Sequence, residues 1–457
     1  MRKSLFSLVA VLVLSLTVGA CGGGEEGTPT AETPGASPSA GPVTIDFWHS
    51  ERASNAETLE RLVERFNASQ NEVRVRASYQ GSYQEATAKL VASLGTGSVP
   101  AILGDGDAQM IVDSGAATPI QEFVDRDGYD LSDVDEKGIE YYTFQGKLWA
   151  MPFAMDTSVL YYNKAMFREV GLDPDKPPQD LEEVRQYSEK LLKRDGSGNV
   201  VRSGIALDIA KWWERVFAER GELWVDKENG HEGHATKVLF DNDTGRWLFQ
   251  WWHDMVDSGL AFNVGRNPTF VDGFLAMSSG RAAMTFSYVS ALRSVVDALE
   301  KSGPGLEFGV SRLTGVPGGK GFSCFVPLGF WILERPKEEQ EAAWKFIKWI
   351  VEPEQQAEWF AGSGFLPVSH SAIDLPPAQD IVARYPLFRE ALDLYLNTPA
   401  MPATVVPVLG SMDRVREIMY TAVEEMLVGG KDPTQALEDG AAAANKAIEE
   451  YNQRVGD

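Results

Sequence analysis

Strand and helix patterns alternate where the predicted globular part begins, and this order restricts the possible folds more than any other feature of the chain. Residues 43–48 and 73–79 alternate apolar and polar side chains, which predicts two strands. Residues 59–66 between them carry apolar side chains at helical spacing. A second helix over 86–94 and a short strand over 100–103 follow. This order is typical of an α/β fold with a parallel sheet.

The first of these helices is expected to begin at a capping box. Ser54 and Glu57 are spaced so that the serine hydroxyl accepts the N–H of the third helical residue, and the glutamate accepts that of the serine. The helix is therefore expected to start at Ser54.

The rest of the chain predicts a second set of strands and helices. Trp247, Trp251 and Trp252 share one side of a strong helix and are expected in a core. Residues 43–457 are too many for one hydrophobic core and fit two lobes. Strands are expected over residues 147–153, 158–162, 204–207, 305–311 and 321–333, and helices over 163–170, 181–191, 244–256, 338–350 and 415–426.

The N-terminus has the pattern of an export signal. Arg2 and Lys3 precede an apolar run over residues 5–16, which is shorter than the roughly 20 residues of a transmembrane helix. The residues before Cys21 resemble the lipobox of bacterial lipoproteins, and this resemblance implies cleavage before Cys21 and lipidation of its sulfur. We therefore expect a signal peptide over residues 1–20 and an extracytoplasmic protein anchored to the cell membrane.

Residues 21–42 are expected to form a flexible linker behind the lipidated cysteine. After Cys21 they contain only Gly, Pro, Ser, Thr, Ala and Glu, and such a stretch cannot bury enough apolar surface to offset its ordering entropy. No second long apolar segment follows, so membrane contact is expected through the lipid alone. A net charge of −24 with no basic stripe argues against nucleic acid as a partner.

Cysteine, histidine and motif patterns do not indicate a disulfide, a metal or a cofactor. Cys324 is the one cysteine besides Cys21 and is expected to be a small buried apolar side chain. His231 and His234 lie three apart, but Gly233 disfavours a zinc-binding helix. No nucleophile elbow, phosphate loop or dinucleotide fingerprint is present. We expect that the protein is not an enzyme. The remote alternative is a carbohydrate-active enzyme, because glycosidases also combine aromatic side chains with paired carboxylates.

Short segments spread along the chain carry a resemblance to one family. They span residues 47–50, 79–83, 160–164, 171–178, 280–285, 364–367 and 410–412. In this order they resemble the extracellular solute-binding proteins of bacterial ABC importers, in the carbohydrate-binding branch and nearest to the glycerol-3-phosphate-binding component. The resemblance implies a two-lobe α/β fold of the periplasmic-binding-protein type (type II), with hinge-crossing strands and a ligand cleft. Lobe 1 is expected over 43–153 and 314–364, and lobe 2 over 154–313 and 365–457.

The resemblance also implies where the ligand contacts lie. The positions that match or replace contact residues of the glycerol-phosphate binder are Tyr83, Asp105 or Asp107, Asp156, Trp212 or Trp213, Tyr288 and Phe365. The residues themselves add two more candidates. His49 and Ser50 follow the first predicted strand, and open α/β sheets bind ligands at the carboxyl ends of their strands.

One departure from the glycerol-phosphate binder bears on the ligand. Val408 stands where that protein has an arginine, and a phosphate in a dry cleft needs such a bidentate partner. Asp156, with Asp105 or Asp107, instead adds carboxylates, which repel phosphate and accept hydrogen bonds from vicinal hydroxyls. Aromatic rings that stack on sugar C–H faces complete the pattern. We expect a neutral mono- or oligosaccharide, captured by a monomer and delivered to ABC permease subunits.

Glycerol-3-phosphate, or a glycerophosphodiester such as glycerophosphocholine, stays open as the alternative ligand. Lys211 could reach a phosphate, and aromatic faces suit a choline cation.

Overall fold

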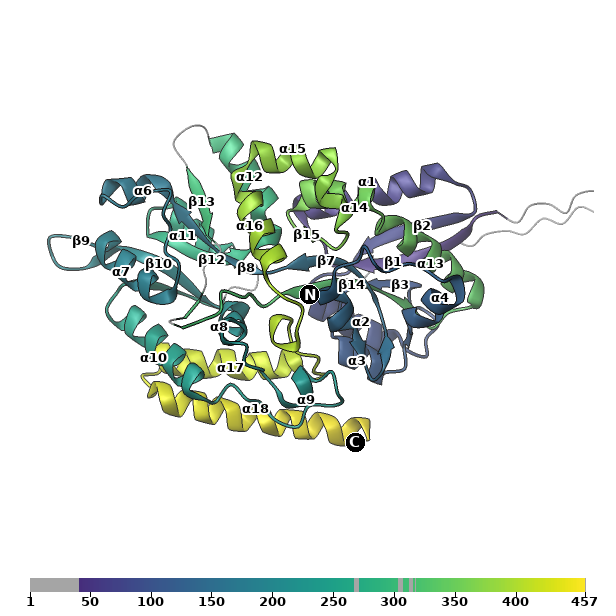
Figure 1. The fold of residues 1–457 in the computed structure, drawn as a ribbon. Helices are drawn as coiled ribbons and strands as arrows, with labels where there is room; N and C mark the ends of the chain where they lie inside the picture. Colours follow the sequence, from purple (N-terminus) through teal and green to yellow (C-terminus); the bar gives the residue numbers. More distant parts are fainter. Residues whose placement is uncertain (1–40, 267–270, 303–306, 312–314, 317, 457) are drawn as a thin grey trace, which may run out of the picture. The chain divides into compact units, whose positions relative to one another are not determined.

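The computed structural model describes residues 41–456, except 267–270, 303–306, 312–314 and 317 (Figure 1). The predicted signal peptide, Cys21 and all but the end of the predicted linker lie outside the described residues. Pro42–Asp457 form one compact unit. In the part of the chain that is described, no helix has the length and apolar character needed to cross a membrane.

The first lobe is organised around a seven-stranded sheet with the order β15-β7-β14-β3-β1-β2, in which β4 also pairs with β14. Its strands are β1 (Val43–His49), β2 (Val73–Tyr79), β3 (Ile102–Gly104), β4 (Ala117–Thr118), β7 (Met151–Asp156), β14 (Val326–Leu333) and β15 (Leu366–Pro367). β1 pairs in parallel with β2 and β3, which confirms the parallel layer expected from the strand–helix alternation. β14 runs antiparallel to β3 and β7, so the complete sheet is mixed.

The second lobe is organised around a six-stranded sheet with the order β11-β10-β12-β8-β13, in which β9 also pairs with β10. Its strands are β8 (Ser158–Asn163), β9 (Lys193–Arg194), β10 (Val200–Ile209), β11 (Ala261–Arg266), β12 (Ala282–Tyr288) and β13 (Phe308–Ser311). β5 (Thr143–Phe144) and β6 (Lys147–Leu148) form a separate hairpin. The two larger sheets with helices around them confirm the two-lobe α/β fold.

Helices cover both sheets and form most of the C-terminal part. They are α1 (Ala53–Ser69), α2 (Tyr83–Ser93), α3 (Ala108–Asp113), α4 (Ile120–Asp127), α5 (Glu136–Tyr142), α6 (Lys164–Glu169), α7 (Leu181–Leu191), α8 (Glu214–Arg220), α9 (Asp226–Asn229), α10 (Asp243–Asp257), α11 (Asp272–Ser278), α12 (Leu292–Ser302), α13 (Lys337–Ile350), α14 (Pro353–Ser363), α15 (Pro376–Arg384), α16 (Pro386–Asn397), α17 (Met412–Leu427) and α18 (Pro433–Val455). Figure 1 shows α17 and α18, in yellow, packed side by side and next to α10.

Thr157 alone separates the strands of the two sheets where the chain first crosses between them. β7 ends at Asp156 and β8 begins at Ser158. The Thr157 hydroxyl bonds the Ser323 hydroxyl at 2.6 Å and donates to the Cys324 carbonyl at 2.9 Å, which ties this crossing to the segment before β14. Because β7 pairs with β14 as far as Asp156, residues 154–156 belong to the first sheet, although the sequence analysis assigned them to lobe 2. The lobe boundaries themselves stay a prediction.

Each lobe has its own aromatic core. Phe47, Phe330 and Phe346 contact one another behind the first sheet. Trp251 and Trp252 of α10 are buried in the core of the second lobe, as their shared helix side predicted. Cys324 is a buried free cysteine, as expected, and burial raises the pKa of its thiol.

The predicted capping box at Ser54 is wrong. α1 begins at Ala53, one residue earlier, and its N-cap Arg52 makes no side-chain capping bond. Ser54 therefore lies inside the first turn, where its hydroxyl contacts the Ser294 hydroxyl at 3.4 Å. A capping box does occur at the start of α2, where Glu85 N–H donates to Ser82 Oγ at 3.2 Å and Ser82 N–H donates to Glu85 Oε2 at 2.6 Å.

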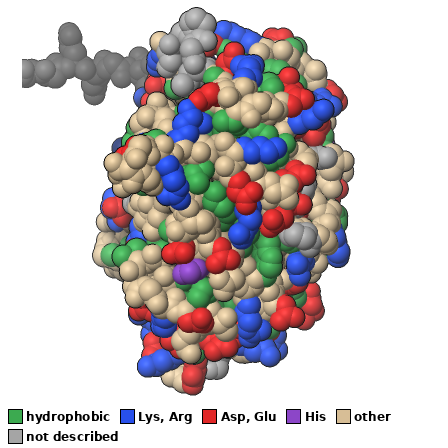
Figure 2. Space-filling model, turned by 90° about the vertical axis from the view of Figure 1, so that its left-hand side faces the viewer, with side chains coloured by type: hydrophobic (Ala, Val, Ile, Leu, Met, Phe, Trp, Pro, Cys, Tyr) green, Lys and Arg blue, Asp and Glu red, His purple; other side chains and the backbone are tan. Residues whose placement is uncertain are grey.

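Charges of both signs are mixed on the molecular surface. In the view of Figure 2, acidic and basic side chains are interspersed and the hydrophobic areas between them are small. Over the described part of the chain many charged side chains pair with each other, as Arg126 does with Asp127 and Glu341. A surface of this kind on the side shown offers no single-sign stripe for a polyanion.

Candidate functional site

A cavity of about 780 Å³ opens where strands of the two sheets end, and we call it the central cavity. The loop after β1 supplies Ser50 and Glu51 to its wall, and the first turn of α1 supplies Asn55. The ends of β10 and β11 supply Ile209 and Arg266. The first turns of α17 close one side of the cavity. The volume lies in the range of roughly 300–1,000 Å³ that is usual for small-molecule sites. Strand ends of both sheets therefore surround a cavity of the size that small-molecule sites have.

The structure brings most of the predicted ligand contacts together in the wall of this cavity. They come from the loop after β1, the start of α2, the residue after β3, the ends of β7 and β12, and the segment between α14 and β15. The residues are Ser50, Tyr83, Asp105, Asp156, Tyr288 and Phe365. The role of each in ligand binding stays a prediction.

Glu51 is a cavity residue that sequence reasoning missed. Its side chain is 9% exposed, and its Oε1 accepts a hydrogen bond from the Tyr83 hydroxyl at 3.0 Å. Burial raises the pKa of Glu51 to about 7, although the bond from Tyr83 opposes this shift. The negative charges of Asp105 and Asp156 raise it further. Its position in the sequence could have indicated it, because Glu51 directly follows the candidates His49 and Ser50 at the end of β1.

Asp156 links the end of β7 to the segment after β12. Its Oδ1 accepts the N–H groups of Thr157 at 2.9 Å and Ser290 at 3.1 Å, and its Oδ2 accepts the Ser290 hydroxyl at 2.7 Å. The side chain is 8% exposed yet lies in the cavity wall. These three bonds hold the carboxylate in a fixed position at the cavity wall.

The two acidic residues after β3 have different surroundings. Asp105 lies in the cavity wall with a left-handed backbone (φ 65°), and its N–H donates to the Gly329 carbonyl at 2.7 Å. Asp107 lies outside this cavity and caps α3, because its Oδ1 accepts the Met110 N–H at 2.9 Å. Burial raises the pKa of Asp107 to about 7. Of the pair left open by the sequence, Asp105 is the one that faces the central cavity.

The structure places three other predicted contacts in packed interior rather than in the cavity wall. Trp212 stacks on Phe286 and contacts Trp252, each with ring centroids 4.8 Å apart. Trp213 packs against Trp224 at 4.9 Å. His49 is buried, and burial lowers its pKa to about 4, so it is neutral at pH 7. Both Trp212 and Trp213 belong to the core of the second lobe.

Two of the three arginines in the cavity wall are already paired with carboxylates. Arg416 of α17 donates to both oxygens of Glu214 at 2.7 and 2.9 Å, and both residues are buried. Arg266 donates to both oxygens of Glu424 at 2.8 Å. Both guanidiniums are thus occupied by the protein's own acids, which reduces their use for a ligand anion. Arg52 is the exception, an exposed side chain whose guanidinium lies 5.7 Å from the Tyr79 ring centroid.

Val408, at the position where the resemblance has an arginine, is fully enclosed. It is 1% exposed and belongs to the hydrophobic core of the first lobe. Its N–H donates to the Asn229 carbonyl at 2.8 Å. The side chain at position 408 therefore supplies no positive charge to the central cavity.

The two histidines that the sequence analysis considered for a metal have other partners. His234 Nε2 lies 2.9 Å from Asp113 Oδ2, and His231 Nδ1 lies 3.3 Å from the Thr143 carbonyl. Another group that brings acids and a histidine together comprises Asp135, Glu136 and His370. Lys137 Nζ pairs with Asp135 at 3.1 Å there, so an ammonium already supplies positive charge to this carboxylate.

Two α/β lobes that enclose a ligand-sized cavity define the class of periplasmic-type binding proteins. The family model for bacterial extracellular solute-binding proteins matches residues 61–390, and the chain belongs to this family. It is a solute-binding protein of the kind that serves ABC importers.

The similar proteins include binders of different ligands. The chain is 28% identical over 428 residues to the sn-glycerol-3-phosphate-binding periplasmic protein of Shigella flexneri, and the alignment covers 90% of this chain and 94% of that one. The same protein of Escherichia coli strain K12 gives the same values. The glycerophosphocholine complex of the Mycobacterium tuberculosis UgpB protein has a TM-score of 0.72 at 22% identity, with 90% and 99% coverage. The cyclic α-maltosyl-1,6-maltose-binding protein of Arthrobacter globiformis has a TM-score of 0.71 at 22% identity, with 90% and 100% coverage.

Proposed function

We propose that the protein captures a neutral sugar in the central cavity and delivers it to an ABC permease. The observation that carries this proposal is the charge arrangement of the cavity wall. Glu51, Asp105 and Asp156 place carboxyl groups there, while Arg266 and Arg416 are held by acids of the protein. Hydroxyl groups of a sugar can donate to such carboxylates without bringing a charge into the site.

Aromatic side chains supply the second half of a sugar site. Tyr83, Tyr288, Phe365 and Tyr420 line the same cavity as the three carboxyl groups. Their ring faces can stack on the C–H faces of a pyranose, and the tyrosine hydroxyls add hydrogen-bonding groups at the ring edges. Apolar faces with polar groups around them are the usual arrangement of small-molecule sites.

A panel measurement tests the proposal. Residues 43–457 are incubated with mono- and disaccharides, glycerol-3-phosphate and glycerophosphocholine, and the melting temperature is followed. Ligands that bind only the folded state raise it. We expect an upshift with at least one sugar and none with glycerol-3-phosphate. An upshift with glycerol-3-phosphate alone would refute the sugar assignment.

A glycerophosphodiester is the second candidate, favoured by the exposed cation at the cavity rim. Arg52 lines the cavity, is exposed and forms no ion pair within 4 Å among the described residues, so it can reach a phosphate. The aromatic and acidic wall around Glu51 would accept a choline cation. Binding of glycerophosphocholine with no response to any sugar would favour this candidate.

The absence of enzymatic activity is part of the proposal. Paired carboxylates beside aromatics also occur in glycosidases. The relatives above are named as binding proteins, which supports binding without turnover. Chromatography of each sugar after incubation should return it unchanged; a hydrolysis product formed at the rate of an enzyme would overturn this part.

We also propose that Cys21 carries a lipid and that residues 21–42 tether a monomeric body to the membrane outside the cytoplasm. The apolar run and small residues before Cys21 support it. The expressed full chain should partition into detergent, and Cys21→Ser should release it into the aqueous phase. Equal partitioning of both proteins would contradict the anchor, and sedimentation of the body as a dimer would contradict the monomer.

A further inference from the structure

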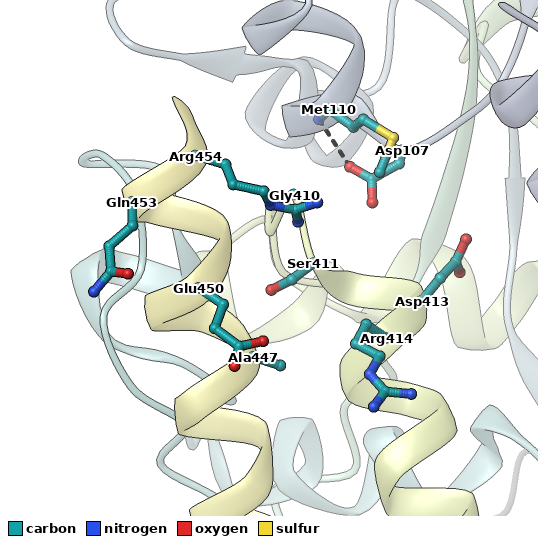
Figure 3. Close-up of a pocket in the computed structure, with 10 residues that line it drawn as sticks. All are labelled: Asp107, Met110, Gly410, Ser411, Asp413, Arg414, Ala447, Glu450, Gln453 and Arg454. Atoms are coloured by element: carbon teal, nitrogen blue, oxygen red, sulfur yellow. Dashed lines mark hydrogen bonds between the residues drawn. The ribbon is translucent and has the colours of Figure 1, made fainter. Parts of the chain in front are cut away.

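A second large cavity lies beside the central one, between α3 and the helices α17 and α18 (Figure 3). Its volume is about 740 Å³. We call it the outer cavity. The side chains that matter below are Asp107 from the N-cap of α3, Ser411, Asp413 and Arg414 from the start of α17, and Glu450 and Arg454 from α18.

A third, small cavity, which we call the neck, lies between the outer cavity and the central cavity and shares wall residues with both. The neck has a volume of about 70 Å³ and shares Asp105 with the central cavity, Asp107 with the outer cavity and Asp413 with both. At this size the neck admits waters, and a sugar ring can enter only after side chains of its wall move. Gln84 Nε2 donates to Asp413 Oδ1 across it at 3.3 Å. This is a single exposed hydrogen bond of a flexible side chain, and a ligand can displace it at small cost.

The outer cavity contains buried polar atoms that lack partners. Ser411 is 7% exposed, and its Oγ has no hydrogen-bond partner among the described residues. Asp107 Oδ2 is also buried and has no hydrogen-bond partner among the described residues. Figure 3 shows the Ser411 oxygen directed into the space between α17 and α18. Because buried polar groups in folded proteins are nearly always hydrogen-bonded, we expect a water or a ligand hydroxyl as the partner of these two atoms.

The charges around the outer cavity favour an uncharged partner with many hydroxyls. Asp107, Asp413 and Glu450 supply carboxylates, and Arg414 and Arg454 supply guanidiniums. Acceptors and donors are therefore both present around one space, without a dominant sign. A hydroxyl is both donor and acceptor and can satisfy each kind of group, whereas an ion would meet repulsion from one of them.

We propose that the outer cavity holds the distal units of an oligosaccharide whose first units fill the central cavity. The ligand then passes through the neck once Gln84 has moved away from Asp413. This inference rests on the proposed sugar function and extends it, because it assigns a saccharide longer than the central cavity alone would take.

The test compares affinity with chain length. Calorimetry is run on the full body with homologous series of α-glucans, β-glucans and mannans, each beginning at the disaccharide. Ser411→Ala and Arg454→Gln change the outer cavity. Ser278→Ala and Arg74→Gln are matched controls, because both residues are exposed and far from it along the chain. Since the Ser411 hydroxyl has no partner, its removal leaves the fold intact, and thermal unfolding of each variant checks this.

The expected result is a length-dependent loss. Both outer-cavity variants should bind the disaccharide as the wild type does and should bind the longer homologues roughly twofold to tenfold more weakly for each lost hydrogen bond. The controls should match the wild type at every length. Equal affinity of variants and wild type for all lengths would show that water alone fills the outer cavity, and an equal loss at every length would also overturn the inference. If no saccharide binds any protein, the proposed function itself fails, which is a different result.

Discussion

The Tyr83 hydroxyl donates a hydrogen bond to Glu51 Oε1 over 3.0 Å, and this bond connects the start of α2 to the loop after β1 at the cavity wall. Burial raises the pKa of Glu51 to about 7. Near neutral pH the carboxyl group can therefore accept a hydroxyl hydrogen bond when ionised or donate one when protonated. The pair is a hydrogen-bonding centre that responds to pH.

Glu51 should make the stability of the free protein depend on pH. Its ordinary pKa is 4.5 and its folded pKa is about 7, so between these values the folded state holds a proton that the unfolded state has lost. The free energy of unfolding therefore falls as pH rises through this window. Glu51→Gln removes this contribution. From pH 5 to pH 8 the free energy of unfolding of the variant should therefore rise relative to that of the wild type by roughly 1–3 kcal/mol.

Urea unfolding at the two pH values measures this difference. Glu57→Gln, an exposed substitution on α1, is the control and should keep the wild-type pH dependence. A Glu51→Gln variant whose stability follows the wild-type pH slope would contradict the assignment.

Asp156→Ala should weaken sugar binding by roughly 1–3 kcal/mol, because it removes both a candidate ligand acceptor and the anchor of Ser290. Ser290→Ala removes only the hydroxyl bond to Asp156 and should cost about 0.5–1.5 kcal/mol. Calorimetry with the best sugar measures both, with exposed Asp257→Ala as the control. If Asp156→Ala and Ser290→Ala have the same effect, Asp156 acts only by positioning Ser290.

Arg416→Met should strongly destabilise the protein, because it leaves the buried Glu214 carboxylate without its bidentate partner. The expected loss is about 3–5 kcal/mol, and adding Glu214→Leu should recover part of it. Chemical denaturation measures all three proteins. Arg414→Met, two residues away on the exposed side of α17, should stay within about 0.5 kcal/mol of wild type. A double variant no more stable than the single one would argue against the unpaired charge as the cause.

Trp212→Ala should lower the free energy of unfolding by about 3–5 kcal/mol, because the ring packs between Trp252 and Phe286. Measured at a temperature where the variant is fully folded, its sugar affinity distinguishes a packing role from direct contact. Wild-type affinity would assign Trp212 to the core. A loss of tenfold or more in the folded variant would restore Trp212 as a ligand contact.

Periodicity predicted the layers of the fold well, because strand and helix patterns depend on neighbours in the chain. The helices expected over 244–256 and 338–350 correspond to α10 and α13. The start of α1 was predicted less well. Ala53 adopts a left-handed backbone (φ 48°) there, and the chain turns before the serine that could have capped the helix. Backbone geometry of this kind has no periodic signal.

The cavity wall was predictable only in part. The resemblance indicated Tyr83 and Asp156, and both line the cavity. Arg266, Arg416 and Tyr420 were missed because they reach the cavity from β11 and α17, far from the lobe 1 residues in sequence. The resemblance also indicated Trp212 or Trp213, but in the structure Trp212 packs against Phe286 of β12 and Trp213 against Trp224. Long-range packing decides such cases, and one sequence does not reveal it.

A calorimetric titration of the body with a binding disaccharide, and with glycerol-3-phosphate under the same conditions, tests the central claim most directly. The cavity carboxyl groups, the paired arginines and the enclosed Val408 predict saturable heat with the sugar and none with glycerol-3-phosphate. Saturable heat with glycerol-3-phosphate, and none with any sugar, would contradict the account.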